Sequence, residues 1–325
     1  MRPRLQSSRG SVRRRIAIVR ARRFGGWIGT EAMQLHLVDA TYELFRAHYS
    51  PRPGVFAPDG RDIGAVVGLC YTLLTLLRDE GATHVGCASD HVIRSFRNDL
   101  YHGYKTEAGM PPELLAQFPF AERAMEAMGL IVWPMVEFEA DDAMATAVFR
   151  WADWPGVERV WICTPDKDLA QCVRGEHVVL RDRRRDRTID EAGVAARCGV
   201  PPASIPDYLA LVGDSADGFP GLPGWGAKSA AAVLARFGHL EAIAADPRVW
   251  HVAVRSPTVL NATLRAQWQD ALLFRRLATL RVDVPLPQIN PDELFWRGAR
   301  RTAFTALCDE LGQPRLAERP HIWQD

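Results

Sequence analysis

The sequence contains no long hydrophobic run, no paired-cysteine motif and almost no lysine. No stretch of about 18 apolar residues occurs among its 325 residues, which excludes a membrane-spanning helix. The six cysteines form no CxxC pair and no Cys/His spacing typical of zinc sites. We therefore expect reduced core cysteines, as in a cytosolic protein. No internal repeat is found.

Charge is unevenly distributed along the chain. Residues 1–32 contain nine arginines and one acid, so the remaining residues hold 31 basic and 38 acidic side chains. The arginine-rich segment has no apolar core of a signal peptide and no hydrophobic periodicity, which favours a disordered extension over a nucleic-acid-binding arm. An acidic body is unusual for a nucleic-acid enzyme, whose surface is normally basic.

Strand-like and helix-like segments alternate in the first part of the chain. The residue pattern predicts four strands, at residues 35–39, 83–88, 131–134 and 157–163. Helices are expected at residues 42–48, 62–78, 112–128 and 140–151. This alternation predicts an α/β fold with a mostly parallel sheet flanked by helices, in which ligands bind beyond the carboxyl ends of the strands.

From about residue 189 the pattern becomes mainly helical. A Gly/Pro-rich stretch at residues 218–226 interrupts it, and residues 257–273 are expected to form one long helix. Residues 181–187, with five arginines and two aspartates, are expected to form a solvated hairpin or loop. We thus predict an α/β domain over residues 33–188 and a helical region over 189–325.

Acidic residues occur in close pairs after the predicted strands. Each pair alone could be a helix cap or a turn. Two carboxylates about 4 Å apart repel by roughly 4 kcal/mol at an effective dielectric near 20, so a crevice holding all of them requires cations. The nine acids are Asp39, Asp90, Glu139, Asp141, Asp142, Asp166, Asp168, Asp214 and Asp217.

Carboxylates without His or Cys suit Mg²⁺ or Mn²⁺. Two such ions about 3.5–4 Å apart can activate a water and stabilise the leaving oxygen of a phosphoryl displacement. Without these nine acids the body would be slightly basic, so a cation-loaded crevice would not repel phosphate.

The ordered motifs resemble the bacterial and phage 5′→3′ exonucleases, a family that includes the nuclease domain of DNA polymerase I and is related to flap endonucleases. The similar segments span about residues 33–285: LVDA at 37–40, FRNDLY at 96–101, YK at 104–105, MPPEL at 110–114, FEADD at 138–142, DKD at 166–168, GDSAD at 213–217 and PGLPGWGAKSA at 220–230.

The resemblance implies a site divided between two metal ions. Asp39, Asp90, Glu139, Asp141 and Asp142 would serve the first ion, and Asp166, Asp168, Asp214 and Asp217 the second. Arg97 and Lys105 would contact the scissile phosphate at the base of a helical arch over about residues 98–120. The spacing that places Asp90 is the weakest of these matches.

The resemblance also implies a helix–three-turn–helix over about residues 204–237 that binds duplex DNA. Gly221, Gly224, Gly226 and Lys228 would contact phosphates, and backbone carbonyls would hold K⁺. The three lysines, Lys105, Lys167 and Lys228, all lie in these motifs, which suggests that a compact ammonium is needed there.

The sequence departs from the family pattern at three positions. Pro165 stands where Gly is usual, Gly218 where Asn is common, and Glu107 near the place of a basic residue. None of these departures removes an expected metal ligand. No polymerase segment follows, so we expect a stand-alone nuclease that acts as a monomer in the bacterial cytoplasm.

The expected substrate is DNA with a free 5′ end, as in a flap or a nicked or gapped duplex, and an RNA–DNA hybrid would also fit. Two alternatives stay open: a non-catalytic DNA-binding module, and a related nuclease that acts mainly on RNA.

Overall fold

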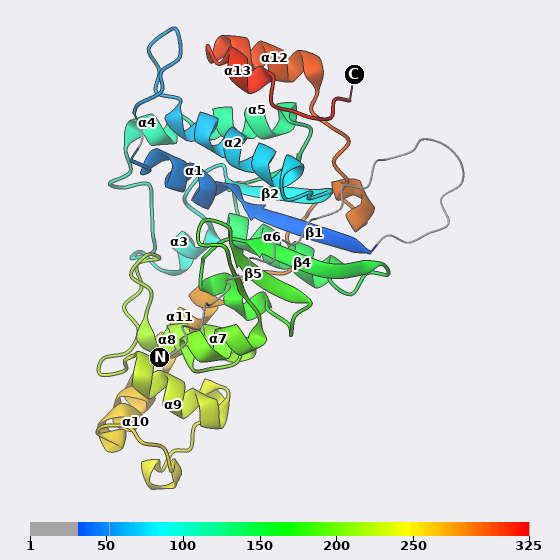
Figure 1. Ribbon diagram of the computed structural model, residues 1–325. Helices are drawn as coiled ribbons and strands as arrows, with labels where there is room; N and C mark the ends of the chain where they lie inside the picture. Colours follow the sequence, from blue (N-terminus) through cyan, green and yellow to red (C-terminus); the bar gives the residue numbers. More distant parts are fainter. Residues whose placement is uncertain (1–31, 52, 325) are drawn as a thin grey trace, which may run out of the picture. The chain divides into compact units, whose positions relative to one another are not determined.

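The computed structural model describes residues 32–324 except residue 52 (Figure 1). The basic extension expected over residues 1–32 therefore lies outside the described residues, apart from Ala32. Within the described residues no helix has both the length and the apolar character needed to cross a membrane.

A six-stranded sheet forms the centre of the α/β part. Its strand order is β3-β2-β1-β4-β5-β6, and every neighbouring pair is parallel except β5 with β6. The hairpin expected at residues 181–187 is the turn between these last two strands. The strands are β1 (Met33–Asp39), β2 (His84–Asp90), β3 (Ile131–Met135), β4 (Val157–Cys163), β5 (Val178–Asp182) and β6 (Arg187–Ile189).

Helices cover both faces of the sheet because its strands send apolar side chains to both sides. Leu35 and Leu37 of β1 belong to one core, together with Met144 of helix α6. Val38 belongs to a second core on the opposite face, with Leu44 of α1. The covering helices are α1 (Ala40–His48), α2 (Gly64–Arg78), α5 (Phe118–Ala127) and α6 (Ala140–Trp151).

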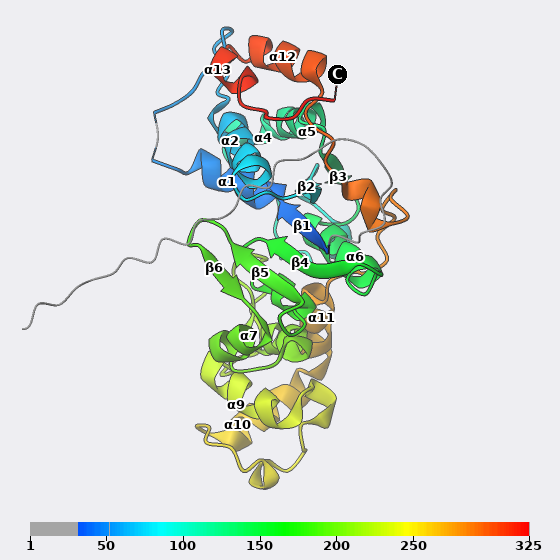
Figure 2. The same ribbon diagram turned by 45° about the vertical axis from the view of Figure 1, so that its right-hand side comes forward.

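A helical region follows the sheet, on the side of α6 (Figure 2). The single helix expected over residues 257–273 is two helices that meet at Gln267, whose backbone is not helical. The helices are α7 (Glu191–Cys198), α8 (Ile205–Val212), α9 (Ala227–Phe237), α10 (Pro257–Ala266) and α11 (Trp268–Ala278).

The segment expected to form a helical arch contains little helix. Only α3 (Phe96–Leu100) and α4 (Pro112–Leu115) lie there before α5, and residues 101–111 form turns and irregular backbone. The helix expected over residues 112–128 is divided because Pro119, which has no backbone N–H, lies in the first turn of α5.

The last part of the chain returns to the α/β core rather than to the helical region. Helix α12 (Arg301–Glu310) lies beside α5, and α13 (Pro314–Ala317) packs on α12 (Figure 1). Phe304 and Leu307 are buried in the same core as α2 and α5. The Trp296 backbone N–H donates to the Thr83 carbonyl at 2.7 Å. The expectation of one helical region over residues 189–325 therefore differs from the structure. The last 30 or so of these residues pack on the α/β part and complete its core.

Phe304→Ala should destabilise the protein by about 3–5 kcal/mol, because the fully buried ring would leave a cavity. Urea unfolding measures the change. Phe149→Ala is the matched control: this ring is 61% exposed, so its removal should change the free energy of unfolding by only about 0.5 kcal/mol. Equal effects of the two substitutions would show that the C-terminal helices do not belong to the core.

Candidate active site

The carboxyl ends of the parallel strands bring acids together at one edge of the sheet. Asp39 ends β1, and Asp90 ends β2. Glu139 is the N-cap of α6, and Asp166 and Asp168 follow β4. The Ala140 N–H donates to Asp90 Oδ1 at 2.7 Å, which ties the end of β2 to the start of α6. The topology therefore explains why residues distant in sequence share one crevice.

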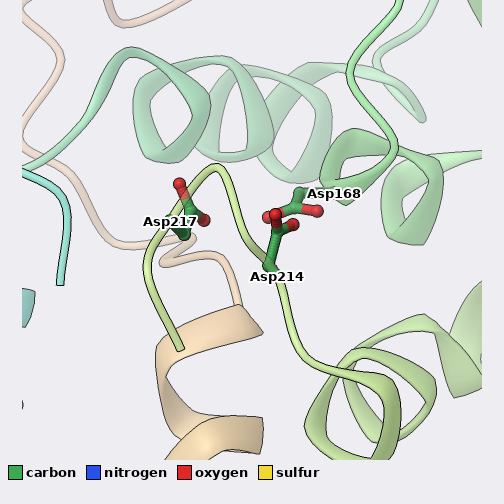
Figure 3. Close-up of side chains that lie close together, drawn as sticks. All are labelled: Asp168, Asp214 and Asp217. Carbon is green, nitrogen blue, oxygen red and sulfur yellow. The ribbon is translucent and has the colours of Figure 1, made fainter. Parts of the chain in front are cut away.

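Three of the four acids expected at the second metal lie close together. One carboxylate oxygen from each of Asp168, Asp214 and Asp217 lies within 4.8 Å of the others. Figure 3 shows Asp214 and Asp217 on one loop, facing Asp168. All three residues are buried, and Asp168 Oδ1 has no hydrogen-bond partner. Asp166 is not part of this group, but its Oδ1 accepts the Asp168 N–H at 2.9 Å.

The acids expected at the first metal are less tightly grouped. In the described part of the chain, no three of these five carboxylates come as close as the Asp168 group does. Burial raises the pKa of Asp39 to about 7, and repulsion from Asp90 adds to the rise. Burial likewise raises the pKa of Asp90 to about 6. Burial and then repulsion from Asp166 and Asp39 hold the pKa of Asp141 well above its usual value. Asp39, Asp90, Asp141 and Asp166 thus share one electrostatic environment.

Two lysines offset part of this negative charge. Lys105 Nζ lies 2.8 Å from both Glu139 Oε2 and Asp217 Oδ1, so it joins the two expected metal sets. Lys167 Nζ lies 2.7 Å from Asp214 Oδ2. Although burial opposes ionisation, Lys105 and Arg97 lower the pKa of Glu139 to about 2. Glu139 therefore stays ionised while its neighbours are harder to ionise.

Arg97 and Asp142 lie in different surroundings from those expected. Both side chains are fully buried, and they form a bidentate ion pair with both contacts at 2.7 Å. The structure therefore places the Arg97 side chain away from solvent and gives Asp142 a cation partner from within the chain.

Several polar residues at the site were not among the expected site residues. The Thr164 hydroxyl donates to Asp39 Oδ2 at 2.9 Å, and the Ser95 hydroxyl donates to Glu139 Oε1 at 2.6 Å. The Tyr104 hydroxyl reaches Glu139 Oε2 at 3.3 Å. Thr164 could have been suspected from its place directly after β4, between strand and Asp166.

Gly218, where the family commonly has Asn, is explained by a close backbone approach. Its φ is +88°, and a Cβ there would lie 2.2 Å from the Gly103 carbonyl oxygen. This approach brings the Lys105 N–H to the Asp217 carbonyl at 2.9 Å. The glycine thus allows the segment carrying Lys105 to pack on the loop carrying Asp217.

The expected DNA-binding glycines connect α8 to α9. Gly221 has a φ of +70°, and a Cβ there would lie 2.3 Å from the Gly213 nitrogen, so a side chain cannot be accommodated. Gly224, Gly226 and Lys228 are exposed, and Gly226 is the N-cap of α9. Exposed backbone N–H groups at the start of a helix can bind phosphate.

The donor set fits a hard divalent cation. Buried carboxylate oxygens lie within ligand spacing of each other, one of them has no partner, and the group includes no thiolate or imidazole. Asp168, Asp214 and Asp217 would hold such an ion.

Family models match nearly all of the described chain. One, described as the 5′-3′ exonuclease N-terminal resolvase-like domain, matches residues 34–199. A second, described as the 5′-3′ exonuclease C-terminal SAM fold, matches residues 200–302. The chain belongs to the 5′-3′ exonuclease family. Membership in this family makes the protein a nuclease, that is, a hydrolase, and confirms the resemblance found in the sequence.

Relatives of this 5′-3′ exonuclease family member include bacterial polymerases. DNA polymerase I of Rhizobium leguminosarum is 36% identical over 318 residues, which cover 87% of this chain and 30% of the relative. DNA polymerase I of Mycobacterium tuberculosis H37Rv is 34% identical over 291 residues, covering 88% and 31%. The chain thus spans about a third of the length of the curated relatives it matches.

A solved structure shares the fold of this exonuclease family member. The flap endonuclease of bacteriophage T5, in a complex with DNA and metal ions, has a TM-score of 0.58 and 17% identity, covering 88% of this chain and 99% of that chain. The expected α/β fold with a helical C-terminal region is confirmed.

In EDTA, the protein should lose stability as the pH rises from about 4 to about 7.5. An acid whose pKa is raised on folding stabilises the folded state below its unfolded value near 4, and this contribution is lost as pH passes its folded pKa. Asp39 and Asp90, with pKa values of about 7 and about 6, set this window. The loss should be roughly 3–6 kcal/mol in the free energy of unfolding.

Thermal unfolding from pH 4 to 8, with EDTA or with Mg²⁺, measures this dependence. Mg²⁺ should restore stability at the upper end, because it binds the ionised carboxylates. Asp39→Asn should flatten the EDTA profile, whereas Asp153→Asn, which changes an exposed surface aspartate, should not. A flat profile for the unmodified protein would contradict the expectation.

Proposed function

We propose that this protein is a metal-dependent 5′→3′ exonuclease and 5′-flap endonuclease that hydrolyses DNA phosphodiesters. The observation that carries the proposal is the buried group of Asp168, Asp214 and Asp217, with its unpartnered oxygen. The exposed start of α9 offers a binding site for duplex backbone. The T5 neighbour with DNA and metal ions supports this combination of a cation site and a DNA surface.

Two divalent ions, Mg²⁺ or Mn²⁺, would lower the pKa of the attacking water and stabilise the leaving oxygen. Asp168, Asp214, Asp217 and Asp166 would hold one ion, and Asp39, Asp90, Glu139 and Asp141 the other. Lys105 would place its ammonium at the scissile phosphate, because its Nζ already lies between the two sets and 28% of its side chain is exposed.

The helical region would bind the duplex beside the cleaved strand. The Gly224 N–H, the exposed backbone at Gly226, whose own N–H donates to the Ser229 hydroxyl, and the Lys228 ammonium would line the phosphate path, and carbonyls of this loop would hold K⁺. The substrate would be DNA with a free 5′ end, including flaps and nicked or gapped duplexes, and an RNA primer paired to DNA would be accepted. Replication and repair in the bacterial cytoplasm would supply such ends.

A 5′-flap duplex labelled at its 5′ end should be cleaved with Mg²⁺ and left intact with EDTA. Asp168→Asn should lower the cleavage rate by at least about 10²-fold, because a metal ligand is lost. Duplex binding, measured by fluorescence anisotropy in Ca²⁺, should stay within about threefold. Asp153→Asn is the matched control and should cleave normally. Folded protein that binds the flap but never cleaves it would support the non-catalytic alternative, and faster cleavage of an RNA flap would support the RNA nuclease.

Lys228→Ala should weaken duplex binding, because one phosphate contact is lost. The logarithm of the binding constant falls with the logarithm of the salt concentration, and the steepness of this fall should decrease by about one. Binding titrations at several salt concentrations measure the slope. Arg236→Ala removes a charge from the other end of α9 and should leave it unchanged. Equal slopes for the two variants would place the duplex elsewhere.

A further inference from the structure

Both carboxylate oxygens of Asp142 are engaged by partners that the fold fixes in place, namely a buried guanidinium and two backbone N–H groups. Its Oδ1 accepts from Arg97 Nη2 at 2.7 Å and from the Arg281 N–H at 2.9 Å. Its Oδ2 accepts from Arg97 Nη1 at 2.7 Å and from the Glu139 N–H at 3.0 Å. A carboxylate has about four lone-pair sites, and these four bonds use them. Asp168 differs from Asp142, because its Oδ1 has no hydrogen-bond partner.

The Arg97 guanidinium is likewise held by acceptors within the protein. Besides the two bonds to Asp142, its Nε donates to the Leu277 carbonyl at 2.8 Å and its Nη2 to the Thr279 carbonyl at 3.3 Å. Its Nη1 also lies 3.2 Å from Glu139 Oε1. Four of the five guanidinium donors are thus used in hydrogen bonds, and the side chain is only 1% exposed, which leaves a phosphate no access to it.

The pair connects elements of both parts of the protein. Asp142 lies in the first turn of α6, next to Asp141, and Arg97 lies on α3. Leu277 lies in the last turn of α11, where carbonyls have no partner within the helix. Gln171 adds to this junction, since its Nε2 donates to the Ala278 carbonyl at 3.0 Å and its Oε1 accepts the Leu280 N–H at 3.1 Å.

We propose that Arg97 and Asp142 are positioning residues that fix the end of α11 against the first turn of α6. The inference rests on the proposed function: the pair holds the helical region that binds duplex DNA in register with the acids that cleave it. Asp141 then faces the crevice, while Asp142 faces the junction. Lysine cannot replace Arg97, because it lacks the planar fork that serves two carboxylate oxygens and a carbonyl together.

The test is a double substitution that keeps the volume and removes the charges, Arg97→Met with Asp142→Leu. Each single variant leaves a buried charge unpaired and should lower the urea midpoint more than the double variant does. The exposed pair Arg174 and Asp153, changed in the same way, is the matched control and should behave like the unmodified protein.

Metal binding separates a positioning role from a ligand role. In calorimetric titrations with Mn²⁺, the double variant should bind as many ions as the unmodified protein, each within about threefold in affinity, whereas Asp168→Asn should lose one. Loss of an ion in the double variant would overturn the proposal and return Asp142 to the ligand set.

Hydrogen exchange and kinetics separate positioning from a role in folding alone. The double variant should exchange the amides of residues 277–284 at least tenfold faster, with α2 unchanged, and its kcat on the flap should fall at least tenfold. Unchanged exchange, or an unchanged kcat in an active preparation, would overturn the proposal. If the unmodified protein cleaves nothing, the proposed nuclease function fails, while the Mn²⁺ and exchange results still decide the role of the pair.

Discussion

Repulsion between buried carboxylates is the constraint on which the rest of this structure depends. The parallel sheet delivers acids to one edge because its strands all end there. Three internal cations make the arrangement tolerable: Lys105 between Glu139 and Asp217, Lys167 on Asp214, and Arg97 on Asp142. The charge that they leave uncompensated is concentrated at Asp168, Asp39, Asp90 and Asp141, where burial and repulsion raise the pKa values. These are the positions where an added cation stabilises the protein most.

Much of this arrangement could be predicted from sequence because it follows from periodicity and strand direction. Each expected strand was found within one or two residues, and the acids after β1, β2 and β4 followed. The roles of Asp141 and Asp142 could not be separated, because adjacent residues on a helix point about 100° apart and a motif does not say which one faces the crevice. The partner of Asp142 lies 45 residues earlier in the chain, and no local pattern records such a contact.

The irregular segments were the least predictable. The break of the expected helices at Gln267 and before Pro119 depends on one or two residues. The return of the chain after α11 has no periodic signal, because its order comes from single contacts such as Trp296 with Thr83. Composition therefore identified a helical region but not its end. The structure instead shows a nuclease fold in which the helical region is inserted between two parts of the same core.

That insertion has a consequence for the order in which the protein folds during synthesis. The core around α2 and α5 needs Trp296, Phe304 and Leu307, which leave the ribosome some 200 residues after α2. Until then part of its apolar surface stays uncovered, for longer than in a domain built from contiguous sequence. The helical region can fold in the meantime from local contacts. The core on the α2 side of the sheet is therefore completed only when synthesis has passed α12.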